Sequence, residues 1–283
     1  MKKRQTAFIA ILIGIIVLLV KFFAYFVSNS VALFSDALES IVNIAASVLM
    51  FFSVFISEKP ADQDHNYGHE RIENLSCMIE GLLIVAAAVL IVYTAAGRLF
   101  AAADLLEVNL GIGISMLATG MNAGLSLFLA RAAKKNGSAA LEGDSKHLLS
   151  DVISSAGVWL GLFVAELTGW SILDPALAFI VAALIVRIGA GLIWSSSTNL
   201  MDRSCPKEEK KIIEVLLRHK PNFFDYHELK TRRHGNRVFS ELHLTVLKSL
   251  SIEEAHNRAD HLEEELKKEM PLISLTIHLE PAK

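Results

Sequence analysis

Cysteine is nearly absent from this sequence of 283 residues, which contains only Cys77, inside an apolar run, and Cys205. Two such residues cannot form a disulfide framework or a thiolate metal site. An excess of basic charge is also missing, because the formal net charge is -3. That value excludes a nucleic-acid-binding protein that works through overall basicity. The H-E-x-x-H, G-x-S-x-G and phosphate-loop motifs are absent as well, so we do not expect an enzyme, and no residue is assigned a catalytic role.

Charge is sparse in the first two-thirds of the chain. Residues 5–200 hold 24 charged side chains, whereas the much shorter segment 201–283 holds 30. Hydrophobic residues make up 53% of the whole sequence. This distribution indicates a membrane domain over residues 1–204 and a soluble domain over residues 205–283.

Six apolar segments have about the 20 residues that a membrane-spanning helix needs. They cover residues 7–27, 31–57, 74–97, 109–131, 147–168 and 175–196. The first segment is too long for a cleaved signal peptide and no A-x-A site follows it. We therefore expect a polytopic α-helical membrane protein with six transmembrane helices and with both termini on the same side.

Lysine and arginine gather in alternate connections between these segments. The basic residues on one side are Lys2, Lys3, Arg4, Lys59, Arg71, Arg131, Lys134, Lys135, Arg203 and Lys207. The opposite connections offer only Arg98, near a helix end. Because positive charge stays on the cytoplasmic side, both termini are expected to be cytoplasmic.

The soluble segment has its own alternation of helix and strand patterns. Charged amphipathic helices are predicted over residues 207–220 and 252–270, and alternating strands flank His234-Gly235-Asn236 and cover residues 274–280. The resulting order, αββαβ, is typical of a small α+β sandwich.

Two of the apolar segments carry polar side chains at membrane depth, where each ionisable group costs about 2.5–3.5 kcal/mol. The second segment carries Asp36, Glu39 and Asn43, and Asp144, His147 and Asp151 lie at the start of the fifth. Offsets of three and seven residues place each trio on one helical stripe. Helix-packing hydrogen bonds or capping would account for Asp36 and Asp144, but the four remaining residues predict an intramembrane metal site.

The connection between the second and third segments contains Asp62, His65 and His69. A carboxylate three residues before one histidine, with another histidine four residues later, suits a first-row transition metal. The alternative is a polar loop that holds two solvated histidines.

The soluble segment contains seven of the ten histidines. Strand alternation places His243 on the polar face of residues 238–246, and His278 and Glu280 on the polar face of the last strand. If these strands are near neighbours, the three side chains share one face, and His227 can join them. For any one of these histidines, a solvated surface position is the alternative.

These motifs resemble those of the cation diffusion facilitators, and among them the dimeric bacterial zinc and iron exporters. The resemblance covers nearly the whole chain and is carried by four stretches. They are residues 30–43, residues 60–69, His147-Leu-Leu-Ser-Asp151 and Asp174-Pro175.

The resemblance implies three metal sites. They are a transport site of Glu39, Asn43, His147 and Asp151, a loop site of Asp62, His65 and His69, and a cytoplasmic site of His227, His243, His256, His278 and Glu280. It also implies a homodimer and a ferredoxin-like or metallochaperone-like fold for residues 205–283, the cytoplasmic tail. A further implication is an ion pair between Arg71 and Asp202, which we call the charge interlock.

This chain departs from the zinc and iron members at Glu39 and Asn43, where they have two aspartates. The four transport ligands then carry a formal charge of -2 in place of -3. Zinc remains the expected ion because a tetrahedral site with imidazole suits it, with Fe²⁺ and Mn²⁺ as alternatives.

The expected function is proton-coupled efflux of a divalent metal cation by a secondary active transporter in a prokaryotic inner or plasma membrane. Metal ions would serve as substrate and as regulatory ligands of the tail, with no prosthetic group. Protons and metal would compete for His147 and Asp151. A membrane-anchored metal sensor or scaffold that does not transport is the alternative.

A charge pair is predicted between Glu80 and Arg187, because an arginine halfway along the sixth segment needs a counter-charge or a watery cavity. In the alternative, the side chain of Arg187 extends toward the membrane–water interface and Glu80 lines the cytoplasmic cavity.

Overall fold

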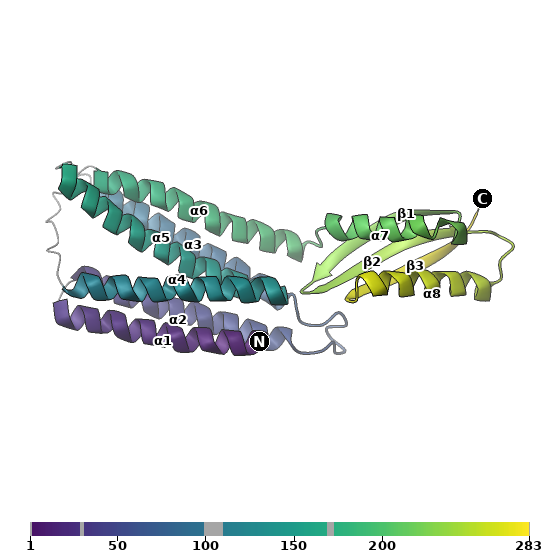
Figure 1. Ribbon diagram of the computed structural model, residues 1–283, viewed down its shortest axis with the longest axis horizontal. Coiled ribbons are helices and arrows are strands. Elements are labelled where there is room, and N and C mark those ends of the chain that lie inside the picture. Colours follow the sequence, from purple (N-terminus) through teal and green to yellow (C-terminus); the bar gives the residue numbers. More distant parts are fainter. Residues whose placement is uncertain (1, 29–30, 99–109, 169–172, 283) are drawn as a thin grey trace. The chain divides into compact units, whose positions relative to one another are not determined.

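A computed structural model describes residues 2–28, 31–98, 110–168 and 173–282 (Figure 1). Some helix residues near these gaps, including Asp36 and Glu39, are described by their backbone alone. The chain divides into two compact units, Met1–Ser197 and Thr198–Lys283. Each unit is described by itself below.

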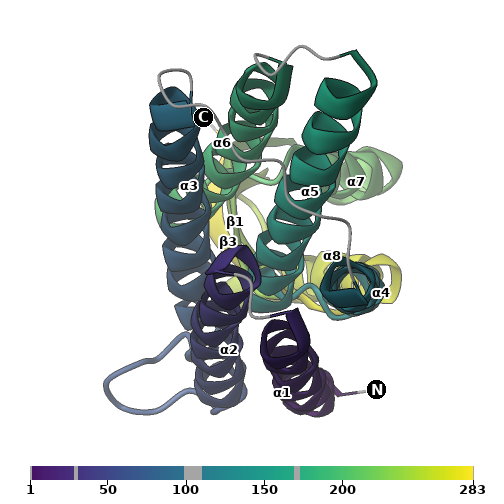
Figure 2. The same ribbon diagram turned by 90° about the vertical axis from the view of Figure 1, so that its left-hand side faces the viewer.

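The first unit is a bundle of long helices, seen along its length in Figure 1 and end-on in Figure 2. The helices are α1 (Lys3–Ser28), α2 (Val31–Ser57), α3 (Ile72–Arg98), α4 (Leu110–Asn136), α5 (Ala139–Thr168) and α6 (Leu173–Leu200). Helix α5 extends to the N-terminal side of the apolar segment 147–168 and starts at Ala139, after a short turn in which Gly137 adopts a positive φ of 58°. This first part of the helix carries the charged residues Glu142, Asp144 and Lys146, so its hydropathy is low and the apolar segment does not include it.

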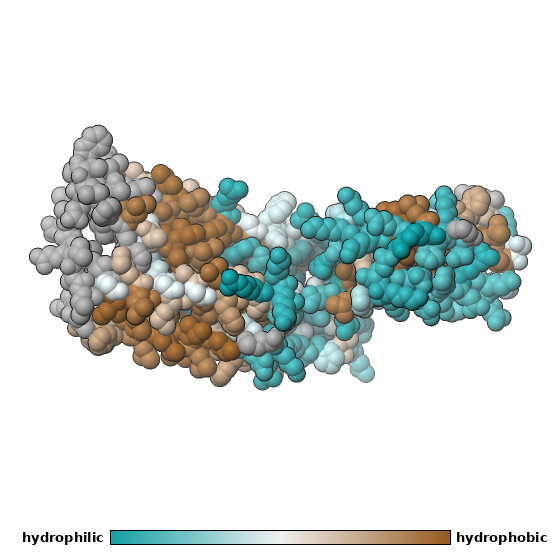
Figure 3. Space-filling view, in the orientation of Figure 1, coloured by the Kyte–Doolittle hydropathy of each residue, from teal (hydrophilic) through white to brown (hydrophobic). Residues whose placement is uncertain are grey.

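Four segments among the described residues are long and apolar enough to cross a membrane. They lie in α1 (Lys3–Phe26), α2 (Ser40–Ser57), α3 (Ile72–Gly97) and α6 (Ala178–Leu200). Helices α4 and α5 have more polar sequences, which include Asn122 and Lys134 in α4 and Asp144 in α5. Figure 3 shows apolar surface over the first unit and mostly hydrophilic surface over the second.

Glycines allow several of the helices to pack closely. A Cβ atom on Gly81 of α3 would lie 2.9 Å from the carbonyl oxygen of Gly189 in α6, and one on Gly189 would lie 2.8 Å from the carbonyl oxygen of Gly81. Ile84 of α3 and Ile185 of α6 belong to one buried cluster beside this contact. The backbones of α3 and α6 therefore touch, and the two helices form a tightly packed pair.

The second unit contains α7 (Pro206–Arg218), β1 (Asp225–His234), β2 (Arg237–Val246), α8 (Ile252–Glu269) and β3 (Ile273–Pro281), with a short 3-10 helix at Lys220–Asn222. The order αββαβ is the one predicted from the sequence. The strands form a sheet of order β1-β2-β3, in which β1 and β2 are antiparallel and β2 and β3 are parallel.

Both helices of this unit cover one face of the sheet. Leu242 and Leu244 of β2 share a buried core with Leu216 of α7 and with Leu262 and Leu266 of α8. Since successive strand residues point to opposite faces, His243 lies on the face away from the helices.

Candidate metal-binding sites

The predicted transport residues Asn43, His147 and Asp151 meet between α2 and α5. They are buried, with 7%, 4% and 7% of their surface exposed. The amide nitrogen of Asn43 donates to Oδ2 of Asp151 at 2.6 Å, and Oδ1 of Asn43 lies 3.0 Å from Nε2 of His147. Because His147 and Asp151 are one turn apart on α5, both point to the same residue of α2. Three of the four predicted ligands are thus brought together.

The side chains of the fourth predicted ligand, Glu39, and of Asp36 lie outside the described residues. Asp144 is fully buried, and each of its oxygens lies 3.1 Å from the hydroxyl of Ser47. This contact joins α5 to α2, as expected if Asp144 makes a helix-packing hydrogen bond.

The predicted ion pair between Glu80 and Arg187 is wrong within this chain. Glu80 is fully buried and its Oε2 lies 3.9 Å from Nδ1 of His147. Arg187 is on the exposed side of α6, whose buried residues include Ile185 and Leu192. The rotation of the two helices therefore separates the charges: Glu80 faces α5, and Arg187 faces outward.

The loop residues Asp62, His65 and His69 form a second cluster, in which one ligand atom from each lies within 4.8 Å of the others. Nδ1 of His65 and Nε2 of His69 lie 3.3 Å and 3.4 Å from the two oxygens of Asp62. The backbone N–H of His65 donates to Asp62 Oδ1 at 2.7 Å, and this bond is the main reason why the pKa of Asp62 is below its ordinary value. The carboxylate therefore stays charged and available to a cation.

The third cluster crosses the sheet of the second unit. In the strand register, His227 of β1 lies opposite His243 of β2, which in turn lies beside His278 of β3. Glu280 Oε1 is 3.0 Å from Nδ1 of His243, and Glu280 Oε2 is 3.4 Å from Nε2 of His227. His227, His243 and Glu280 have ligand atoms within 4.8 Å of one another. The ring of His278 lies at the edge of this group, with its centroid 4.7 Å from that of His243.

A bulge in β1 adjoins this cluster. The register shifts between His227 and Lys230, and Glu228 adopts a left-handed φ of 51°. The carboxylate of Glu228 lies 3.9 Å from Nε2 of His243, and a hydrogen bond from Lys230 lowers its pKa. Sequence analysis missed Glu228, because a bulge changes the alternation on which strand phase depends.

His256 does not join the cluster within one chain, which corrects the predicted ligand set. It lies on α8 and its Nε2 is 3.3 Å from Asp260. Because α8 covers the opposite face of the sheet, His256 and His243 are separated by the sheet itself. Asp202, predicted to pair with Arg71, lies 3.9 Å from Arg232 within the second unit. Since Arg71 belongs to the first unit, the interlock stays a prediction.

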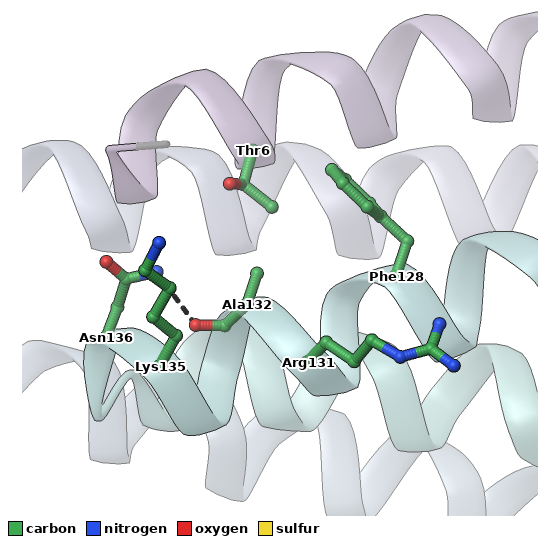
Figure 4. A pocket seen from close by; sticks show the side chains of 6 residues that line it. All are labelled: Thr6, Phe128, Arg131, Ala132, Lys135 and Asn136. Carbon is green, nitrogen blue, oxygen red and sulfur yellow. Dashed lines mark hydrogen bonds between the residues drawn. The ribbon is translucent and has the colours of Figure 1, made fainter.

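A shallow hollow of about 200 Å³ lies between α1 and α4 (Figure 4). Its lining consists of Thr6, Phe128, Arg131, Ala132, Lys135 and Asn136. None of these is a predicted metal ligand, so this hollow is separate from the three clusters.

A helical bundle with buried polar side chains, joined to a small domain with a cluster of histidines and a glutamate, is typical of a membrane protein that handles metal cations. Two family profiles match the chain: a cation efflux transmembrane domain over residues 7–201 and a cation efflux protein cytoplasmic domain over residues 205–282. The chain therefore belongs to the cation diffusion facilitator family, and it is an integral membrane protein of a family that exports metal cations.

Curated relatives extend over most of the chain. An uncharacterized transporter of Synechocystis, sll1263, is 34% identical over 91% of this chain and 84% of its own length. The cation-efflux pump FieF of Shewanella oneidensis is 28% identical over 93% of this chain and 88% of its own. A solved structure of CzrB is 39% identical and covers 28% of this chain and 98% of its own, with a TM-score of 0.27.

Proposed function

We propose that this protein exports a divalent transition-metal cation from the cytoplasm in exchange for protons, with Zn²⁺ as the first candidate and Fe²⁺ or Mn²⁺ as alternatives. In this proposal all six helices of the first unit span the membrane, both termini are cytoplasmic, and two copies form a homodimer. The family and its cation-efflux pumps support the general activity.

The observation that carries the proposal is the buried set Asn43, His147 and Asp151. Amide oxygen, imidazole and carboxylate are ligands of divalent transition metals. In the structure they hydrogen-bond to one another, which offsets the cost of burying polar groups in the membrane. A cation entering between α2 and α5 would replace these bonds, with Glu39 as the fourth ligand.

Proton exchange follows from the same residues. A metal ion binds carboxylate and neutral imidazole, so metal and protons compete for Asp151 and His147. Alternating access then requires the helices around the site to open it to one side at a time. The tightly packed pair α3 and α6 is the natural moving unit, because its members touch through Gly81 and Gly189.

Metal uptake into proteoliposomes tests this function. Zn²⁺, Fe²⁺ and Mn²⁺ are supplied in parallel under an imposed pH gradient, for wild type, Asp151→Ala and His147→Ala. We expect both variants to abolish flux while still eluting as folded protein. Flux close to that of the wild type in both would refute the assigned site.

The tail cluster favours a second activity, metal sensing. His227, His243 and Glu280 lie on the helix-free face of the sheet, where cytoplasmic metal can reach them. If the protein only senses metal, neither the wild type nor any variant will show a metal flux that depends on the pH gradient. His243→Ala will nevertheless lose metal binding by the tail.

A further inference from the structure

Glu80 is a buried carboxylate of α3 that lies beside the transport site and is not one of its four predicted ligands. Its exposed surface is 0%, and neither of its oxygens has a hydrogen-bond partner among the described residues. Leaving a buried polar group in this state costs about 1–3 kcal/mol, and more for a charged group. A cost of that size calls for a functional explanation.

The packing of α5 makes room for this side chain. A Cβ atom on Gly143 would lie 3.0 Å from Cγ of Glu80 and 3.1 Å from Cα of Cys77. Gly143 is one turn before His147 on the same face of α5. The missing side chain therefore lets the stem of Glu80 lie against α5 and brings Oε2 to 3.9 Å from Nδ1 of His147.

The hydrogen bonds of Asn43 determine which nitrogen of His147 carries the proton in this structure. Because the amide nitrogen of Asn43 donates to Asp151, its oxygen faces His147 and must accept a hydrogen bond from Nε2–H. For Nε2 to bind a metal, it must give up that proton and present its lone pair. A neutral imidazole then carries its proton on Nδ1, the nitrogen that faces Glu80.

We propose that Glu80 is a positioning residue of the transport site, which accepts a hydrogen bond from Nδ1–H of His147 when Nε2 binds the metal. This inference rests on the proposed function. Histidine ligands commonly donate their second ring N–H to a carboxylate, which fixes the tautomer and strengthens the ligand.

Transport kinetics of two variants test the proposal. Glu80→Met removes the acceptor and the charge at similar volume, whereas Glu80→Gln keeps an acceptor oxygen and removes the charge. Loss of such a partner costs about 10–100-fold in metal affinity. We therefore expect KM for Zn²⁺ uptake to rise about 10–100-fold in Glu80→Met and less in Glu80→Gln, with a much smaller change in the maximal rate per folded protein.

Glu142→Gln is the control, because it neutralises a half-exposed carboxylate of α5 that pairs with Lys146 outside the transport site. It should leave KM unchanged. An unchanged KM in Glu80→Met, or a fall in maximal rate alone, would overturn the role of Glu80. The outcome is separable from failure of the proposed function: if Asp151→Ala and His147→Ala abolish flux but Glu80→Met keeps the wild-type KM, only the role of Glu80 is wrong.

Discussion

Glu73, in the first turn of α3, links four helix ends of the first unit. Its Oε1 accepts hydrogen bonds from Nζ of Lys3 at 2.9 Å and from the hydroxyl of Ser57 at 2.6 Å, and its Oε2 accepts one from the hydroxyl of Ser138 at 2.5 Å. Lys3 begins α1, Ser57 ends α2, and Ser138 immediately precedes α5. Replacing this carboxylate should therefore loosen the bundle at one end.

The expected cost of Glu73→Gln follows from the burial of its partners. The side chain of Glu73 is 3% exposed and that of Lys3 is 17% exposed. Removing one member of a buried ion pair costs about 3–5 kcal/mol, because the other charge is left unpaired. Lys3 retains some contact with water, and the glutamine oxygen can still accept a hydrogen bond from a serine hydroxyl. We therefore expect the free energy of unfolding to fall by about 3 kcal/mol, the lower end of that range.

A double-mutant cycle on thermal unfolding in detergent measures this pair. Lys3→Met removes the stranded ammonium, so the double variant should be more stable than the sum of the two single losses implies. Glu142→Gln is the control: Glu142 pairs with Lys146 at 2.6 Å with 54% of its side chain exposed, and such pairs contribute about 0–1 kcal/mol. Additive losses, or a Glu73→Gln variant as stable as Glu142→Gln, would refute the argument.

Three further predictions concern the tail. Ser251 caps α8 by accepting from the backbone N–H of Glu254, so Ser251→Ala should destabilise the tail by about 1 kcal/mol in denaturant unfolding. The backbone N–H of Ser251 also lowers the pKa of Glu254 below its ordinary value of 4.5. Its stabilising contribution is therefore complete above pH 4.5 and is lost as the pH falls through the lowered pKa, so the difference between wild type and Glu254→Ala should shrink there; a constant difference would refute this. Zn²⁺ at 100 times its Kd should stabilise the tail by about 2.7 kcal/mol, and His243→Ala should lose this effect.

The tail site could be inferred from the sequence because strand alternation fixes which face a side chain occupies. His243, His278 and Glu280 fall on the polar face of their strands by this rule alone, and the register then places His227 opposite His243. Alternation does not predict the order of the strands in the sheet. Only the family resemblance implies His256 as a ligand; alternation does not relate α8 to the sheet, and His256 lies on the other side of the sheet.

The membrane site was only partly accessible from the sequence. Helical spacing places His147 and Asp151 on one stripe, and burial of polar groups marks that stripe as important. Spacing within one helix says nothing about how a neighbouring helix is rotated. The predicted pairing of Glu80 with Arg187 rests on the need of a membrane arginine for a counter-charge, whereas the packing of α3 on α5 and α6 turns the two side chains to different surroundings. A usable signal was Gly143, because a glycine one turn from His147 marks a close approach by another helix.

Helix α3 combines features that connect the site to the rest of the bundle. Glu73 and Glu80 are seven residues apart, so they lie two turns apart on one face, where Glu73 contacts α1, α2 and the residue before α5 and Glu80 approaches His147. Gly81 meanwhile holds α3 against α6 through Gly189. A movement of the α3 and α6 pair away from α5 would therefore separate Glu80 from His147 and Glu73 from Ser138 together. Because both contacts are present here, the structure has α3 and α5 closed against each other along this face.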